Sequence, residues 1–167
     1  LFLLRRAERL PLDGQLEDAS LIERTGATAV AALLDGLPLA LDQAGAYIRE
    51  LGCSFADYLD RYQEQRLSLL QQRGLLALDH PESVVTTWSL SFDKIRQSNL
   101  AAAELLSLFT FLYPEDIPEE VLSEGAFALG PVLGPVASER YKLNEALREL
   151  LKFSLLQRYA VTRTCTC

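Results

Sequence analysis

The most restrictive feature of this sequence is a run of apolar residues at helical spacing, enclosed between helix breakers. The run comprises Leu37, Leu41, Ala44, Ile48 and Leu51. Intervals of four, three, four and three residues place these side chains on one face of an α-helix. Gly36 precedes the run and Gly52 follows it, while Pro38 falls in the first turn, where its missing N–H costs nothing. The pattern predicts a helix from Pro38 to Leu51 that meets the preceding helix in a tight corner.

Similar spacing elsewhere predicts a mostly α fold. We expect further helices in residues 1–9, 16–35, 55–78, 83–97, 100–112, 118–124 and 143–151. Ser54 and Asp57 have the spacing of a capping box at the start of one of these helices. Residues 130–135 contain two Gly-Pro steps and are expected to form a loose connector. The β-type residues in 155–161 predict a short strand near the C-terminus.

The charge balance argues against nucleic acid as a partner. The chain has 167 residues, a formal net charge of −7 and 49% hydrophobic residues, so it can form a core and has an acidic surface. An acidic surface repels phosphate backbones. Basic residues at Arg5-Arg6 and in residues 140–152 are mixed with acids, and we interpret them as solvated helix faces.

Cysteine usage and hydropathy predict a cytoplasmic protein that does not enter the membrane. No apolar run approaches the roughly 20 residues that a membrane-spanning helix needs. Cys53, Cys165 and Cys167 lack the spacing of a redox or zinc motif and are interpreted as ordinary thiols in a reducing compartment. Because the sequence contains no methionine, we expect Leu1 to lie inside a longer protein.

No arrangement of residues predicts catalysis by this chain. The sequence has no Gly-x-x-x-x-Gly-Lys-Ser/Thr loop to cradle phosphates, and no apolar run ends in paired acids that could hold Mg²⁺. The single histidine, His80, is beside a proline in a polar segment and is interpreted as solvated. We therefore expect no catalytic residues, no metal site and no enzymatic activity from this chain alone.

Residues 36–48, which read GLPLALDQAGAYI, resemble the "GLPL" segment of NB-ARC proteins, the STAND-class signalling NTPases. On their own these residues predict only a tight corner between two helices. Four other segments extend the resemblance in the order found in the family, especially in its bacterial, tetratricopeptide-repeat-associated members. These segments are residues 3–7, 80–92, 105–118 and 143–159.

The resemblance implies a fold and a role. Residues 1–78 would form the helical lid subdomain (ARC1-like), a helical bundle that carries the GLPL turn. Residues 79–167 would form a winged-helix-like subdomain (ARC2-like) with a short C-terminal β element, truncated relative to the family. By this correspondence Pro38 contacts the adenine of ADP or ATP, with Leu37 and Leu39 as neighbours. The implied partners are an upstream nucleotide-binding domain and a downstream repeat domain of the same parent protein.

The family also has a histidine after the winged-helix strand, whereas residues 160–167 contain none. The resemblance implies that ADP or ATP binds the full-length parent. Because this chain lacks the histidine and the phosphate-binding loop, we expect the chain alone to bind nucleotide weakly at best. Two other functions remain open. Burial of Pro38 against the chain's own side chains would favour a helical interaction module without a nucleotide role. An unopposed basic face on residues 144–152 would favour a DNA-binding winged helix.

Overall fold

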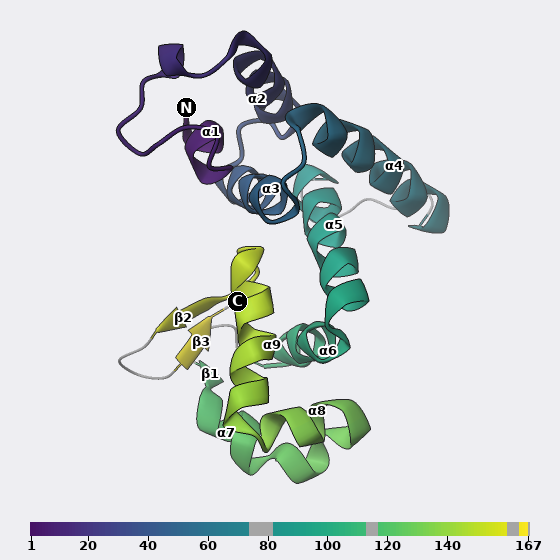
Figure 1. Ribbon diagram of the computed structural model, residues 1–167. Helices are drawn as coiled ribbons and strands as arrows, with labels where there is room; N and C mark the ends of the chain where they lie inside the picture. Colours follow the sequence, from purple (N-terminus) through teal and green to yellow (C-terminus); the bar gives the residue numbers. More distant parts are fainter. Residues whose placement is uncertain (74–81, 113–116, 160–163, 167) are drawn as a thin grey trace. The chain divides into compact units, whose positions relative to one another are not determined.

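Two units make up the chain in the computed structural model, which describes residues 1–73, 82–112, 117–159 and 164–166. The first unit comprises Leu1–Ser91 and the second Phe92–Cys167, and helix α5 (Glu82–Ser98) runs from one into the other. The predicted mostly α fold is confirmed (Figure 1). The predicted division between residues 78 and 79 falls in residues 74–81, outside the described residues, and stays a prediction.

The first unit is built from helices only. Its elements are α1 (Phe2–Arg6), the short 3-10 helix η1 (Leu16–Asp18), α2 (Leu21–Leu33), α3 (Pro38–Leu51), α4 (Phe55–Arg73) and the first part of α5. Helix α1 packs chiefly on α3 and also on α2, while α4 packs on α2 and α3. The predicted helix over residues 16–35 is interrupted, because the Ser20 side chain accepts a hydrogen bond from the Glu23 backbone N–H and starts α2 there (3.2 Å).

Helix α3 is buried over a wide face. Its bounds agree with the prediction, but its buried face is wider than the predicted stripe. The buried residues are Ala40, Gln43, Ala44, Gly45, Ala46, Tyr47 and Ile48. Leu37, Leu41 and Leu51 from the predicted stripe are only half-buried. The broader burial follows from the packing of α1 and α4 against α3.

A group of tyrosines joins α3, α4 and α5 inside the first unit. The rings of Tyr47 and Tyr58 meet edge to face with centroids 5.7 Å apart, and Tyr62 lies 6.3 Å from Tyr58. The Tyr58 hydroxyl is hydrogen-bonded to that of Thr87 on α5 at 3.2 Å. Burial raises the pKa of Tyr58 well above its usual range, so this hydroxyl stays protonated and can act as a donor.

The second unit combines helices with a small sheet. After α5 come α6 (Leu100–Phe109), β1 (Ile117–Pro118), α7 (Glu119–Glu124), the 3-10 helix η2 (Ala126–Ala128), α8 (Gly130–Ala137), α9 (Arg140–Lys152), β2 (Gln157–Tyr159) and β3 (Thr164–Thr166). The short C-terminal β element that the resemblance implies is present as β2 and β3, whereas the winged-helix-like character of this unit stays a prediction. Helix α9 buries a stripe of four residues, Leu143, Ala146, Leu147 and Leu150.

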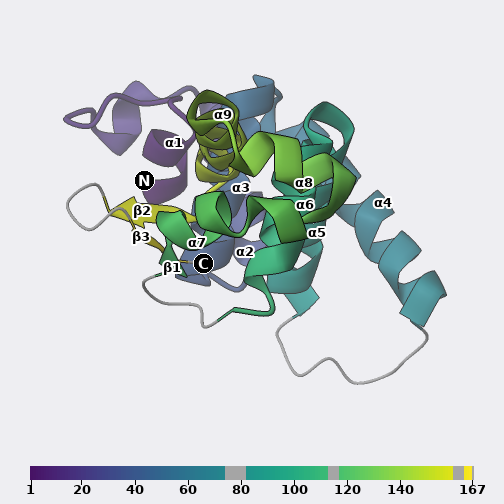
Figure 2. The ribbon, with the colours of Figure 1, turned by 90° about the horizontal axis from the view of Figure 1, so that it is seen from below.

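The three strands form an antiparallel sheet in the order β1-β3-β2. In both ribbon views the sheet lies on one side of α9, with α6 and α8 on the other (Figures 1 and 2). Cys165 on β3 is fully buried, and its thiol lies 3.8 Å from a carboxylate oxygen of Glu119. Arg158 on β2 donates two hydrogen bonds to the same carboxylate, at 2.6 and 2.8 Å. This pair ties the second strand to the start of α7.

Two predictions for the second unit need correction. Residues 130–135 begin a helix, α8, and do not form a loose connector. Gly130 has a φ of +74° that lets the chain turn into the helix, and Pro131 sits in the first turn, where a proline is tolerated. The predicted strand over 155–161 is confirmed only for β2, and residues 160 and 161 lie outside the described residues. The pairing strands β1 and β3 were not predicted.

Among the described residues, no helix combines the length and apolar character needed to cross a membrane.

The predicted capping box is present, and its removal should destabilise the first unit. The backbone N–H of Asp57 donates to the Ser54 hydroxyl oxygen (3.1 Å), and the backbone N–H of Ser54 donates to the Asp57 carboxylate (3.0 Å). The variant Ser54→Ala should lose about 1 kcal/mol of unfolding free energy at neutral pH. Chemical denaturation followed by circular dichroism measures this loss.

The same box predicts how that loss depends on pH. The hydrogen bonds from Ser54 lower the pKa of Asp57. The stabilisation is therefore complete above the ordinary aspartate pKa of about 3.9 and disappears as the pH falls through the folded-state value. The difference between Ser54→Ala and the unaltered protein should shrink as the pH falls below about 4. An equal difference at acid and neutral pH would contradict a role for the ionised carboxylate.

Candidate functional site

The corner between α2 and α3 is held by backbone hydrogen bonds of the Schellman type. Helix α2 ends at Leu33 with Leu34 as its cap residue. The N–H of Gly36 donates to the carbonyl of Ala31 at 3.0 Å, and that of Asp35 to Ala32 at 3.2 Å. Gly36, the predicted C-cap, therefore lies two residues beyond the actual cap residue, Leu34, and closes the helix end through its N–H.

Two consecutive residues of the corner adopt left-handed backbone conformations. Asp35 has a φ of +52° and Gly36 a φ of +67°. Aspartate tolerates this region better than most side chains, and glycine has no Cβ to oppose it. Leu37 then returns to an extended conformation as the N-cap of α3, with Pro38 at the first helical position. The chain reverses from one helix into the next over these few residues.

The corner exposes the residues that the resemblance assigns to adenine. Pro38 is exposed, Leu39 is 55% exposed and Leu37 is half-buried. Leu34 before the corner and Ala40 after it are completely buried, so they anchor the turn while its apex stays accessible. Pro38 and Leu39 therefore form the exposed apex, and Leu37 borders it in a half-buried position.

The chemistry of this apex suits a flat apolar ligand surface. Pro38 has no backbone N–H, and its ring is a rigid apolar surface that requires no hydrogen-bonding partner. The exposed side chain of Leu39 adds apolar area next to it. Contact with a planar ring would remove this area from water, which stabilises by about 25 cal/mol per Å². In the described part of the chain, no group of three or more His, Cys, Asp or Glu side chains could hold a metal ion.

Helix α1 supports the corner from the side of α3. Arg6 donates to the Asp42 carboxylate at 2.6 Å, which joins α1 to the first turns of α3. A Cβ added to Gly45 would lie 2.5 Å from Cγ of Arg6, so the close approach of the two helices requires glycine at this position. The contact fixes the direction in which α3 leaves the corner.

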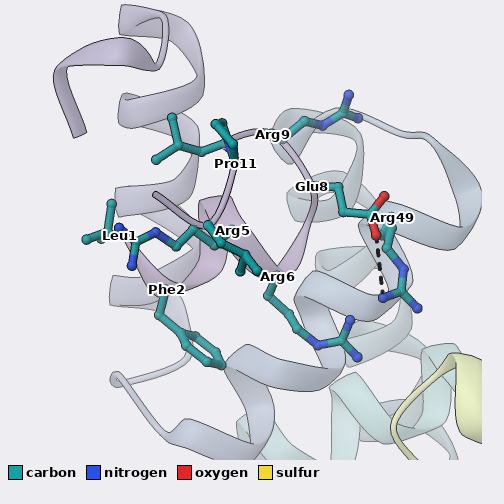
Figure 3. Close-up of a pocket in the computed structure, with 10 residues that line it drawn as sticks. Leu1, Phe2, Arg5, Arg6, Glu8, Arg9, Pro11 and Arg49 are labelled. Carbon is teal, nitrogen blue, oxygen red and sulfur yellow. Dashed lines mark ion pairs between the residues drawn. The ribbon is translucent and has the colours of Figure 1, made fainter. Parts of the chain in front are cut away.

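Sequence reasoning missed a second feature, an open cavity of about 940 Å³ beside α1 that is lined by several arginines (Figure 3). Arg5 and Arg6 were interpreted as part of a solvated helix face. The only signal in the sequence was the clustering of Arg5, Arg6 and Arg9 within five positions. Arg49, which completes the set, comes from the end of α3 and is distant in sequence.

Comparison with known families adds information on the second unit. Residues 90–167 match the model of a family described as "Domain of unknown function (DUF7779)". The matched stretch is almost the same as the second unit, Phe92–Cys167. The unit that the contacts delimit therefore coincides with a stretch that is similar to a recognised domain family. No solved structure matches the chain significantly.

A curated relative is similar over a larger part of the chain. It is named "Nucleotide-binding leucine-rich repeat (NLR)-like protein", comes from Hyaloscypha variabilis and is 30% identical over 123 residues. The match covers 65% of this chain and 12% of the relative, so the chain spans a small part of that protein's length. The relative's name agrees with the predicted resemblance at the level of an NLR-like protein. The bacterial and tetratricopeptide-repeat parts of the prediction stay predictions.

The left-handed conformation of Gly36 predicts how substitutions there change the free energy of unfolding. No atom lies within 4 Å of the Cβ that a substitution would add to Gly36, so the cost of Gly36→Ala is backbone strain alone. We expect this variant to lose roughly 1–2 kcal/mol of unfolding free energy, and Gly36→Asn to lose less. Equilibrium denaturation of the three proteins tests the ranking. A Gly36→Ala variant as stable as the unaltered chain would show that the corner adopts another conformation in solution.

Proposed function

We propose that this chain is the helical lid and winged-helix arm of a nucleotide-switched signalling protein of the NB-ARC type. In this proposal the exposed corner at Pro38 covers the adenine of ADP or ATP, while an upstream domain of the parent protein binds the phosphates and carries out any hydrolysis. The chain itself would have no catalytic residue. The second unit would be the arm that changes position when the nucleotide is exchanged.

The observation that carries the proposal is the exposure of the corner. Pro38 and Leu39 could have been buried as part of an ordinary helix–helix packing contact, and they are exposed instead. An exposed apolar apex on a backbone held by Schellman hydrogen bonds is preorganised for a ligand, since little conformational freedom remains to be lost on binding. The similarity to an NLR-like protein supports the same conclusion.

The second unit supports the proposal through its order of elements and its charges. Strands β2 and β3 follow the last helix, α9, as the short C-terminal β element that the resemblance implies for the arm. A DNA-binding winged helix would require an unopposed basic face on α9. Lys142 is paired with Glu139 and Lys152 with Glu149, each at 2.7 Å, so the charges of these lysines are opposed. At these two lysines, therefore, the structure offers no unopposed basic face for DNA.

The remaining alternative, a helical interaction module without a nucleotide role, predicted a buried Pro38. The exposure of this residue gives that alternative no support. A downstream repeat domain, ADP or ATP as the ligand of the parent and a cytoplasmic location all belong to the proposal. The repeat domain and the nucleotide follow from the resemblance, and the cytoplasmic location follows from the cysteine usage.

The proposal predicts that the corner contributes to nucleotide affinity in the longer protein that contains this chain. The variants Pro38→Ala and Leu39→Ser should each raise the dissociation constant for ADP by about tenfold, because each removes apolar contact worth ~1.4 kcal/mol. Leu100→Ser is the matched control, since Leu100 is 51% exposed and lies on α6 of the other unit. Isothermal titration calorimetry measures the three affinities.

Unchanged ADP affinity in both corner variants would contradict the adenine contact. A separate titration tests the assignment of phosphate binding to the upstream domain. The 167-residue chain alone should show no micromolar affinity for ADP, because it offers one apolar wall of the pocket and no phosphate-binding loop. Micromolar binding by this chain would contradict that part of the proposal.

A further inference from the structure

The cavity beside α1, called here the α1 cavity, combines positive charge with apolar surface. Its lining contains five apolar residues, one glutamate and four arginines, and it includes both α1 and the loop that follows it. The arginines are Arg5, Arg6, Arg9 and Arg49. Figure 3 shows these side chains around the cavity, together with Glu8, Leu1, Phe2 and Pro11. A basic cavity is unexpected on a chain with a net charge of −7.

Two of the four arginines have their charge neutralised by carboxylates. Arg6 is paired with Asp42 at 2.6 Å, and Arg49 with Glu50 at 2.8 Å. Arg49 also lies 3.9 Å from Glu8, the ion pair marked in Figure 3. These two side chains serve the internal structure of the first unit and have less capacity for an external anion.

Arg5 and Arg9 differ from them. Arg5 donates to the main-chain carbonyl of Gly14 at 3.0 Å, and Arg9 to that of Cys53 at 2.9 Å. Within the ranges that the structure describes, neither guanidinium forms an ion pair. The Nε atom of Arg5 is buried and has no hydrogen-bond partner there. Each guanidinium is thus oriented by one carbonyl and retains a full positive charge with unused donors.

Except for the buried Leu10, the apolar part of the lining is exposed where a ligand could reach it. Leu12 is 84% exposed, and Phe2 and Pro11 are also exposed. A small hydrophilic anion such as phosphate would use the arginines and gain nothing from these side chains. A ligand that carries both carboxylates and an apolar side chain would use the whole lining, because arginine forms bidentate hydrogen bonds with carboxylates and the apolar surface is removed from water.

We propose that the α1 cavity binds an acidic peptide segment of a partner protein, with carboxylates on Arg5 and Arg9 and an apolar side chain on Leu12 and Phe2. The net negative charge of the rest of the chain would repel such a segment from other surfaces, which directs it to this basic site. Pro38 is not among the residues that line this cavity, so the site is distinct from the corner.

The test uses the 167-residue chain and a fluorescently labelled peptide in which glutamate pairs flank a leucine-phenylalanine pair. Fluorescence anisotropy should show binding that weakens as the salt concentration rises. A peptide with lysine in place of glutamate should not bind. A peptide with serine in place of leucine and phenylalanine should bind several-fold more weakly, because it lacks the apolar contact.

Variants of the chain identify the site. The double variant Arg5→Gln and Arg9→Gln should weaken binding by at least about tenfold. Arg96→Gln is its control, since Arg96 is an exposed arginine of α5 outside the cavity. Because Arg5 and Arg9 also donate to backbone carbonyls, Leu12→Ser provides a variant that should not disturb folding. It should weaken binding several-fold, whereas Ile22→Ser, at a position that is 83% exposed and outside the cavity lining, should not.

Three results would overturn the proposal. The first is the absence of binding by the acidic peptide at low salt. The second is a Leu12→Ser variant that binds the peptide with unchanged affinity and has the same thermal melting curve as the unaltered chain. The third is displacement of the peptide by an equal concentration of inorganic phosphate, which would assign the arginines to a small anion.

Discussion

The close packing of α1 against α3 is the contact on which the first unit depends. Gly45 allows the two helices to approach until Cγ of Arg6 occupies the space that a Cβ would fill. The same arginine then reaches Asp42 on α3. Both the corner at Pro38 and the α1 cavity are built on this pair of helices, since α3 begins at the corner and α1 lines the cavity. A larger residue at position 45 would displace α1 and alter the cavity directly.

The sequence predicted the elements that local chemistry determines. Gly36, Pro38 and Gly52 punctuate α3, and Ser54 with Asp57 starts α4 as a capping box, so these boundaries could be found from a few neighbouring residues. Elements that depend on distant partners were missed. Strand β1 contains only two residues and exists because Ile117 pairs with Cys165. No periodicity can reveal a strand of that length.

The corner at Pro38 and the α1 cavity also differ in whether neighbouring or distant residues determine them. The corner was predicted because Leu37, Pro38 and Leu39 are consecutive, and the structure adds that the last two are exposed. The α1 cavity could not be predicted, because Arg49 reaches Glu8, and Cys53 reaches Arg9, only after α3 has folded back along α1. Helix α8 is an intermediate case. Its prolines suggested irregular structure, but Leu133 and Ala137 find a buried position against α6 and α9 that favours the helix.

The burial of Cys165 has a practical consequence for the dynamics of the second unit. Its side chain is fully enclosed on the middle strand of the sheet, beside the carboxylate that Arg158 also contacts. A thiol reagent in solution can reach this sulfur only after β3 has separated from its neighbours. The rate of its alkylation therefore reports how often the sheet opens. The Cys165 thiol is therefore an intrinsic probe of local unfolding in this unit.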